Sequence, residues 1–231
     1  MNEIDGMHLR AELIEVGQRL DQRTLISGTE GNVSVRLGQD SILITQSGTM
    51  LGRLMQEDFV RVGLSSGELL DKHGKPTSEL GAHLSAYRSD PNIQAIVHAH
   101  PRSCVALTLR GWTLEGIPLP EAAYAIGSVP TCAFAVPGSD EGGEVMAQWA
   151  AKRDALVFDR HGAFTFGKTP FEAQARMEML DAVAQSVLLA GGPDQLRPMT
   201  TEQVDRVVAN ALKSGVREDS LRAWADAVKL R

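Results

Sequence analysis

The 231-residue sequence contains little cysteine: Cys104 and Cys132 are its two thiols, and no Cys-x-x-Cys pair occurs. Two isolated thiols can build neither a disulfide scaffold nor a zinc site made of thiolates. So little cysteine is typical of a protein from a reducing compartment, and we expect this chain in the cytoplasm.

Long apolar runs and an excess of basic charge are also absent from the sequence. No stretch approaches the roughly 18 to 20 apolar residues that cross a bilayer, and residues 1–10 lack the apolar region of a secretory signal. Lys and Arg number 23 against 29 Asp and Glu, so the net charge is −6. This balance offers no attraction to a nucleic-acid backbone or to anionic lipids. We therefore expect neither nucleic acid nor a membrane as a partner.

The chain is otherwise rich enough in apolar residues to fold around one core. Apolar side chains make up 43% and charged side chains 23%, the mixture of an ordinary globular protein. A length of 231 residues suits one large domain, and no internal repeat or low-complexity segment divides the chain. We predict a single domain over residues 1–231, with 191–231 as a C-terminal helical tail.

Hydrophobic periodicity predicts helices around a group of strands. Apolar residues recur at helical spacing from Leu9, within 78–88 and after the Thr169-Pro170 cap. Pro and Gly are frequent between 113 and 137, which favours loops and short strands there. Helices mixed with alternating or branched stretches indicate a layered α/β domain. The predicted strands are 33–37, 42–45, 59–64, 93–100, 155–158 and 162–166.

His98 and His100 lie two residues apart at the end of a predicted strand. Side chains at i and i+2 leave a strand on the same face, so the two imidazoles can converge on one metal ion. A catalytic metal site needs at least one more ligand, and His161, followed by the small Gly162 at another strand end, is the best candidate. On spacing alone, a structural pair of histidines explains the pattern equally well. The position at a sheet edge favours a metal site.

Three segments combine glycine, hydroxyl and amide groups that suit a phosphate: 28–34, 45–48 and 76–79. The third segment opens a predicted helix, and the N-terminus of a helix favours anions. Each segment alone also has the composition of a plain turn or a helix cap. Any one of them is therefore weak support for a phosphate site.

Two further residues follow Glu79 along the same predicted helix. His83 lies about one turn after Glu79, and Tyr87 follows His83 at the same spacing. A histidine in such a position more often packs or caps than supports a site. We interpret His83 and Tyr87 as core residues, with contact to a ligand of the site as the alternative.

Taken in order along the chain, these motifs resemble those of the class II aldolase and adducin-head family. The sequence is most similar to the zinc-dependent L-fuculose-1-phosphate aldolase type, over residues 9–190. The resemblance implies a single layered α/β domain with a central, mostly antiparallel β-sheet flanked by helices. The strings that carry it are GTEGNVSVR at 28–36, ITQSG at 44–48, KPTSE at 75–79 and VHAHP at 97–101, followed by His161.

The same resemblance implies a role for each motif residue. His98, His100 and His161, together with Glu79, would bind a divalent metal, zinc or else manganese, cobalt or iron. Glu79 would then leave the metal to act as the catalytic acid/base. Tyr124, contributed by the neighbouring subunit of a cyclic homotetramer, would protonate the leaving alkoxide. The phosphate of a sugar phosphate substrate would lie against Gly31, Asn32, Ser47, Gly48, Thr77 and Ser78.

The implied reaction is reversible cleavage of a ketose 1-phosphate, similar to L-fuculose 1-phosphate, into dihydroxyacetone phosphate and an aldehyde. Related branches of the family carry out dehydration, decarboxylation or 4-epimerisation of sugar phosphates on the same scaffold. Glu79 argues against the epimerase branch, in which the corresponding residue resembles Asp. It leaves the dehydratase and decarboxylase branches open. A non-catalytic binding module similar to the adducin head is a further alternative. Such a module has no need of three histidines and a glutamate at metal spacing.

The C-terminal region departs from the pattern of the aldolase branch. That branch carries a tyrosine near its C-terminus, whereas no tyrosine follows Tyr124 in this sequence. The tail instead has an apolar helical pattern, which either packs on the core or covers the site as a lid. A lid would favour substrates such as 5-deoxy- or 5-methylthio-ribulose 1-phosphate. The apolar residues are Leu221, Trp224, Ala225 and Val228.

Overall fold

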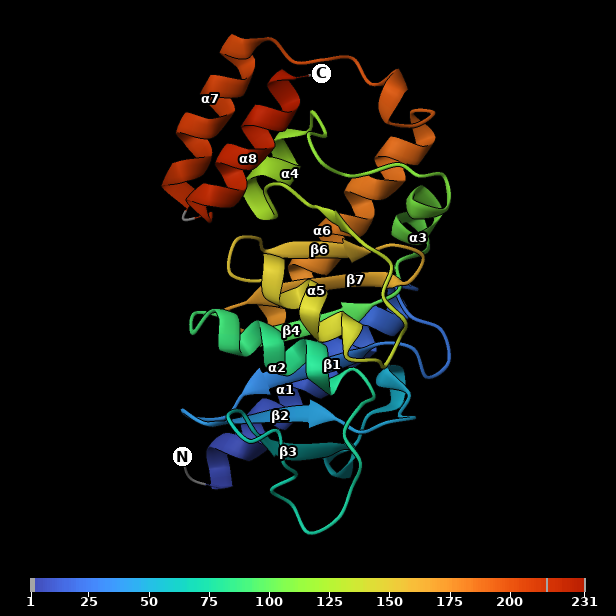
Figure 1. Ribbon diagram of the computed structural model, residues 1–231, viewed down its shortest axis with the longest axis vertical. Helices are drawn as coiled ribbons and strands as arrows, with labels where there is room; N and C mark the ends of the chain where they lie inside the picture. The colour runs from blue at the N-terminus through green and yellow to red at the C-terminus, as the bar shows by residue number, and fades with distance from the viewer. Residues whose placement is uncertain (1–2, 215, 231) are drawn as a thin grey trace.

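Seven strands form the central sheet of the protein, whose computed structural model describes residues 3–214 and 216–230 (Figure 1). The strand order is β3-β2-β1-β4-β7-β6-β5, and every neighbouring pair is antiparallel except β5 with β6. The expected α/β domain with a mostly antiparallel sheet is thereby confirmed. The strands are β1 (Asn32–Arg36), β2 (Ser41–Thr45), β3 (Phe59–Gly63), β4 (Ala95–Ala99), β5 (Thr131–Cys132), β6 (Ala155–Phe158) and β7 (Gly162–Gly167).

The helices predicted from Leu9, within 78–88 and after Thr169 are confirmed as α1, α2 and α6. The side chain of Thr169 caps α6 by accepting a hydrogen bond from the N–H of Glu172. No helix in the described ranges is long and apolar enough to cross a membrane. The helices are α1 (Glu3–Gln22), α2 (Leu80–Ser89), α3 (Arg102–Leu109), α4 (Pro120–Ala125), α5 (Glu141–Trp149), α6 (Pro170–Leu189), α7 (Thr201–Ala211) and α8 (Glu218–Lys229).

Three short helices, α3, α4 and α5, are absent from the sequence prediction. Region 113–137 was expected to hold loops and short strands, and this is wrong for α4, although the two-residue β5 does lie there. Pro120 begins α4 at the first helical position, where its missing N–H leaves no hydrogen bond unmade. The frequent prolines and glycines therefore mark the ends of a helix as well as turns.

Alternation along the strands divides the core between the two faces of the sheet. Val33, Val35 and Val97 belong to the cluster that packs on α1, α3 and α6. Residues of the opposite parity, such as Ile96, belong to the cluster under α2 and α5. Because successive side chains of a strand point to opposite faces, His98 of β4 faces α2 as Ile96 does.

The C-terminal helices α7 and α8 pack beside α4 at one end of the molecule, at the top of Figure 1. Leu221, Trp224 and Val228 are buried there with residues of α4 and α7, and the Trp224 Nε1–H donates to the carbonyl of Ile117 at 2.8 Å. The apolar face of the tail is therefore used for packing. These side chains do not form a lid over the histidines.

Candidate functional site

The sheet edge where β4 ends and β7 begins collects the predicted metal ligands. The two strands are antiparallel neighbours, and His98 of β4 lies opposite Phe164 of β7. His161 immediately precedes β7, and Glu79 immediately precedes α2. Because His98 faces α2, the histidines and Glu79 meet at the N-terminal end of this helix.

The three imidazole rings form a nearly equilateral triangle. Their centroids are separated by 4.8 Å between His98 and His100, 5.0 Å between His98 and His161, and 4.9 Å between His100 and His161. One ligand nitrogen of each ring lies within 4.8 Å of the others. Glu79 completes the group: its Oε2 is 3.0 Å from Nε2 of His98, and its Oε1 is 3.4 Å from Nε2 of His161.

The hydrogen bonds of His98 test whether this group suits a metal ion. Nδ1 of His98 donates to the carbonyl of Ala163 at 2.9 Å, so Nε2 is the ring nitrogen that His98 presents to the group. That atom lies 3.0 Å from Nε2 of His100, whose Nδ1 faces the carboxylate of Glu30 at 3.7 Å. Three imidazoles and a carboxylate are a donor set that divalent zinc and its neighbours accept. The residues therefore fit a divalent metal ion.

Burial and neighbouring charges hold these groups in the protonation states that ligands need. Burial, and then the charge of His98, lower the pKa of His100 to about 3 and that of His161 to about 4. Burial by itself would raise the pKa of Glu79. The charge and hydrogen bond of His98, aided by His161 and Asn32, outweigh it and hold that pKa well below its usual range. At neutral pH His100 and His161 are neutral, and Glu79 is ionised.

Two of the predicted phosphate segments, 45–48 and 76–79, lie side by side. The N–H of Ser47 donates to the carbonyl of Lys75 at 2.9 Å, and the N–H of Thr77 donates to the carbonyl of Thr45 at 3.1 Å. Gly48 has φ +81°, in the left-handed region that glycine adopts freely. The structure therefore brings together the candidate residues of these segments, which are Ser47, Gly48, Thr77 and Ser78.

Gly31 and Asn32 approach the histidines from β1. Gly31 has φ +80°, and a Cβ there would lie 2.7 Å from the carbonyl oxygen of His98, so only glycine fits. Asn32 pairs with His98 across the sheet and is 3% exposed. Its Nδ2 donates to Oε2 of Glu79 at 2.8 Å. The Asn32 side chain is thus committed to Glu79.

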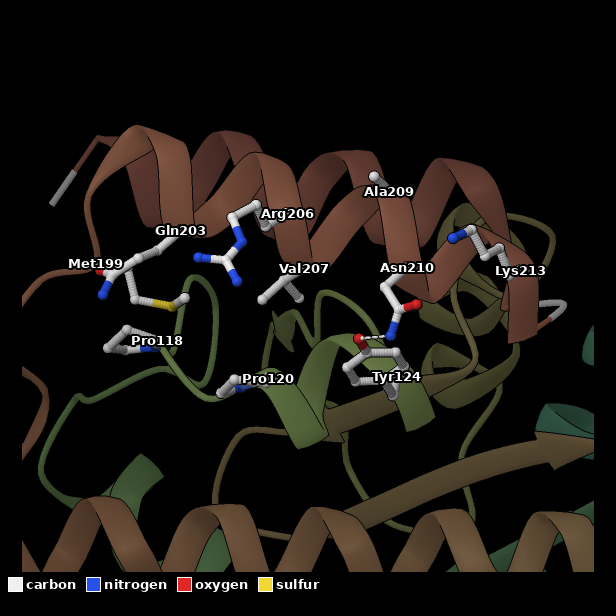
Figure 2. Close-up of a pocket in the computed structure, with 10 residues that line it drawn as sticks. All are labelled: Pro118, Pro120, Tyr124, Met199, Gln203, Arg206, Val207, Ala209, Asn210 and Lys213. Carbon is white, nitrogen blue, oxygen red and sulfur yellow. Dashed lines mark hydrogen bonds between the residues drawn. The ribbon is translucent and has the colours of Figure 1, made fainter.

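Tyr124, the other predicted catalytic residue, lies in a different part of the chain. It lines a cavity of about 740 Å³ between α4 and α7, whose lining includes Arg206 and Lys213 and none of the four candidate metal ligands. Figure 2 shows the Tyr124 hydroxyl accepting a hydrogen bond from Nδ2 of Asn210, at 2.6 Å. Within the described residues of one chain, the structure therefore does not bring Tyr124 to Glu79.

Sequence reasoning missed two features beside the ligands. Glu30 was considered only as part of a glycine-rich segment, yet its carboxylate faces His100. Segment 135–139 borders Glu79 and His161 around a cavity of about 10 Å³, and thereby covers this side of the site. Its Pro-Gly pair is an ordinary turn signal, so the sequence contained no sign of the position over Glu79.

Comparison with known proteins identifies the family. Residues 11–188 match the model described as Class II Aldolase and Adducin N-terminal domain, and the chain belongs to this family. A 3-oxo-tetronate 4-phosphate decarboxylase from Pectobacterium atrosepticum is 33% identical over 199 residues, covering 84% of this chain and 90% of that protein. An L-fuculose phosphate aldolase from Methanococcus vannielii is 33% identical over 174 residues, covering 75% and 92%. The crystal structure of L-fuculose-1-phosphate aldolase from Thermus thermophilus matches with a TM-score of 0.72 and 32% identity, covering 83% and 98%.

Proposed function

We propose that this chain is a divalent-metal lyase that breaks a carbon–carbon bond next to the carbonyl of a sugar phosphate. The first candidate reaction is cleavage of a ketose 1-phosphate, similar to L-fuculose 1-phosphate, into dihydroxyacetone phosphate and an aldehyde. The observation that carries the proposal is the triangle of His98, His100 and His161 with ionised Glu79 at 3.0 Å from His98. Membership of the class II aldolase family supports it.

The three histidines and Glu79 would hold the metal ion. Zinc is the first candidate because imidazole-rich sites suit it, with manganese, cobalt and iron as alternatives. When bound, the ion supplies Lewis-acid stabilisation of the negative charge that develops on substrate oxygen atoms during cleavage. Glu79, which is ionised and mostly buried, removes the proton from the reacting carbon in the direction of bond formation. In cleavage it first takes up a proton and then delivers that proton to the same carbon.

The substrate phosphate would bind where segments 45–48 and 76–79 meet at the start of α2. Backbone N–H groups, the hydroxyls of Ser47, Thr77 and Ser78, and the dipole at this helix end attract an anion without needing Lys or Arg. Gly48 and Gly31 would let the main chain approach the phosphate closely. Ser47 and Ser78 are exposed, so both hydroxyls are accessible to a ligand.

Tyr124 would act in the site of a neighbouring subunit. Tyr124 lies apart from Glu79 within one chain, so this role requires a cyclic arrangement of copies that brings one subunit's α4 to the next subunit's histidines. A heterologous interface that closes as a ring is the geometry required, and we propose a fourfold ring.

Decarboxylation of a phosphorylated 3-oxo acid is the second candidate. Aldol cleavage needs one group that takes the proton from the hydroxyl that becomes the aldehyde and another that protonates the remaining carbon. Loss of carbon dioxide needs only the second group. No tyrosine follows Tyr124 in the sequence, and Tyr124 itself is hydrogen-bonded to Asn210. A site that relies on Glu79 alone therefore favours decarboxylation, and the decarboxylase relative from Pectobacterium atrosepticum agrees with it.

One experiment separates these reactions. The metal-loaded protein is incubated with L-fuculose, ribulose, 5-deoxyribulose and 5-methylthioribulose 1-phosphates and with 3-oxo-tetronate 4-phosphate. We expect dihydroxyacetone phosphate from a ketose 1-phosphate, measured by a coupled reduction. Carbon dioxide from the 3-oxo acid assigns the second reaction, and loss of water assigns a dehydratase. No turnover of any substrate by fully metallated protein would contradict a catalytic role and favour a binding module.

A further inference from the structure

Strand β1 and helix α2 present matching series of polar side chains to each other. Glu79, His83 and Tyr87 follow one another at four-residue steps, which advance about 6 Å along a helix. Asn32 and Ser34 are two residues apart on β1, a step of about 6.6 Å along a strand. Because the two steps nearly agree, the side chains of the strand can alternate with those of the helix.

Four hydrogen bonds join these five residues in one continuous chain. Oε2 of Glu79 is 2.8 Å from Nδ2 of Asn32, and Oδ1 of Asn32 is 2.5 Å from Nε2 of His83. Nδ1 of His83 is 2.7 Å from Oγ of Ser34, which is 2.8 Å from the hydroxyl of Tyr87. We call this series the Glu79–Tyr87 hydrogen-bond chain.

The carboxylate at one end sets the direction of every bond. Ionised Glu79 can only accept, so Asn32 turns its amide N–H to it and its carbonyl to His83. His83 must then carry its proton on Nε2, which leaves a lone pair on Nδ1 for the hydroxyl of Ser34. The Ser34 oxygen in turn accepts a hydrogen bond from the hydroxyl of Tyr87. Each donor therefore points toward Glu79.

Burial keeps the chain of bonds intact. Ser34 and His83 are 0% exposed, Tyr87 is 1% exposed and Asn32 is 3% exposed, so bulk water does not compete for their bonds. Burial, and then the charge of His98, lower the pKa of His83 to about 3, which keeps its ring neutral. A neutral ring is required, because a protonated one would lose the acceptor for Ser34.

We propose that Asn32, oriented by His83 and the rest of the Glu79–Tyr87 hydrogen-bond chain, is a positioning residue that holds the Glu79 carboxylate for proton transfer. The inference rests on the acid/base role of Glu79 proposed above. It replaces the expected role of the Asn32 side chain in phosphate binding, because both ends of its amide are committed to Glu79 and His83. The backbone of Gly31 and Asn32 stays with the phosphate site.

The kinetic test compares variants that break one bond at a time. His83→Leu removes the donor to Asn32 and is expected to lower kcat by about 10- to 100-fold, the usual effect of removing a partner of a site residue. His83→Gln keeps an amide N–H and should recover most of that loss. Tyr87→Phe, at the far end, should cost less than fivefold. His73→Gln changes an exposed histidine and serves as the control.

Two readouts separate positioning from loss of structure or of phosphate contact. In the Glu79→Gln background, His83→Leu should lower kcat less than twofold further, because no acid/base remains to be positioned. Asn32→Ala should lower kcat while the Kd for inorganic phosphate stays within twofold of the parent. An additive loss in the double variant, or an Asn32→Ala variant that loses phosphate binding with kcat unchanged, would overturn the proposal.

A spectroscopic test does not depend on activity. The hydrogen-bond chain requires the Nε2–H tautomer of His83, so ¹⁵N spectra of histidine-labelled, metal-loaded protein should show that tautomer unchanged between pH 5.5 and 8. The His83→Gln spectrum assigns the signal. An Nδ1–H tautomer, or titration near pH 6.5, would overturn the proposal. A parent protein that turns over no substrate but shows the expected tautomer would refute the proposed function and leave the geometry standing.

Discussion

Glu79 has two different neighbours on its Oε2 atom, Nε2 of His98 at 3.0 Å and Nδ2 of Asn32 at 2.8 Å. The first belongs to the candidate metal-ligand group, and the second belongs to a buried hydrogen-bond chain. A carboxylate so placed is ionised and restricted in orientation, which are the properties that a base needs to take a proton from a nearby carbon. The residue-scale predictions follow from this position.

Metal content tests the ligand assignment directly. Protein purified without chelator should contain close to one divalent ion per subunit by elemental analysis, because three imidazoles and a carboxylate converge. His161→Ala should lose most of that metal, whereas His73→Ala, which changes an exposed histidine, should keep it. Equal metal content in the two variants would remove His161 from the site.

Glu79→Gln should keep the fold and most of the metal but lose turnover. The amide preserves the shape of the side chain and can still face Asn32, but it cannot exchange a proton. We expect kcat to fall by about 10² to 10⁴, measured with saturating substrate on protein of known metal content. Turnover equal to the parent would make Glu79 a structural residue.

One buried and two partly buried histidines make stability depend on pH. Unfolded histidines take up protons near pH 6.5, while His83, His100 and His161 have pKa values lowered to about 3, 3 and 4 in the folded protein. Between these limits the unfolded state binds more protons. The free energy of unfolding should therefore fall as pH falls below 6.5, by up to about 1.4 kcal/mol per pH unit for each proton. Because the pKa of Glu79 is lowered in the folded protein, the unfolded state also binds more protons at this residue below pH 4.5. Glu79 therefore lowers the free energy of unfolding further as pH falls.

Urea unfolding of chelator-treated protein at pH 7.5 and pH 5.0 measures this dependence. His83→Gln should make the slope shallower, and His73→Gln should leave it unchanged, since that side chain is exposed. Equal or greater stability of the parent at pH 5.0 would contradict the neutral, buried state of these rings.

At the scale of elements, periodicity predicted the long helices, while short helices depend on their partners. Helices of six to nine residues are not stable alone and form because they pack. α5 is an example: it lies against α2, where the Ser85 hydroxyl donates to the carbonyl of Gly143 at 2.7 Å. No local sequence pattern contains that contact, which explains why α3, α4 and α5 were missed.

Two glycines of α1 provide a matched test of element packing. A Cβ at Gly17 would lie 2.3 Å from the carbonyl oxygen of Leu51, whereas nothing lies within 4 Å of a Cβ at Gly6. In an open helix position Gly→Ala stabilises by up to about 1 kcal/mol. Gly6→Ala should therefore be neutral or stabilising, but Gly17→Ala should destabilise by about 1 to 3 kcal/mol because α1 must move.

Urea unfolding of the two variants at the same pH gives both free energies. We expect the two substitutions to change the free energy of unfolding by different amounts or in opposite directions. Helix propensity alone cannot produce such a difference, since both residues lie in α1. Equal effects of the two substitutions would show that α1 is not closely packed on the segment that contains Leu51.

At the scale of the whole molecule, the C-terminal helices lie beyond the family match but are tied to the sheet domain. Arg217 donates to Asp90 at 2.9 Å and to Asp154 at 3.2 Å, so the start of α8 is joined to the end of α2 and to the residue before β6. The backbone N–H of Ser128 donates to the carbonyl of Ser220 at 3.0 Å. These contacts hold the helical pair beside α4, which carries Tyr124.

Subunit mixing tests whether Tyr124 acts in a neighbouring site. Glu79→Gln and Tyr124→Phe subunits, each impaired alone, are coexpressed and their oligomers are sized by light scattering. If each site draws one residue from each of two neighbours, about one quarter of the sites regain both groups. Activity no higher than the mean of the two parent variants, or an active monomer, would contradict a shared site.

Local sequence patterns were sufficient to predict which residues could bind a metal and where the main strands and long helices lie. His98 and His100 share a face of β4 because side chains alternate along any strand, and Thr169 with Pro170 marks a helix start through local hydrogen bonding. Such features depend on neighbours a few residues away. The mostly antiparallel sheet, by contrast, was expected only from the resemblance to the class II aldolase and adducin-head family.

The contacts of Asn32, His83 and Tyr124 depend instead on how distant elements pack together. Asn32 meets Glu79 across 47 residues of chain and His83 across 51, through the register of β1 against β4 and the packing of α2 on that face. Tyr124 is carried to Asn210 by α4, a helix that exists through packing. Contacts between distant segments depend on the relative placement of whole elements, and burial then commits each polar group to the partner it finds there.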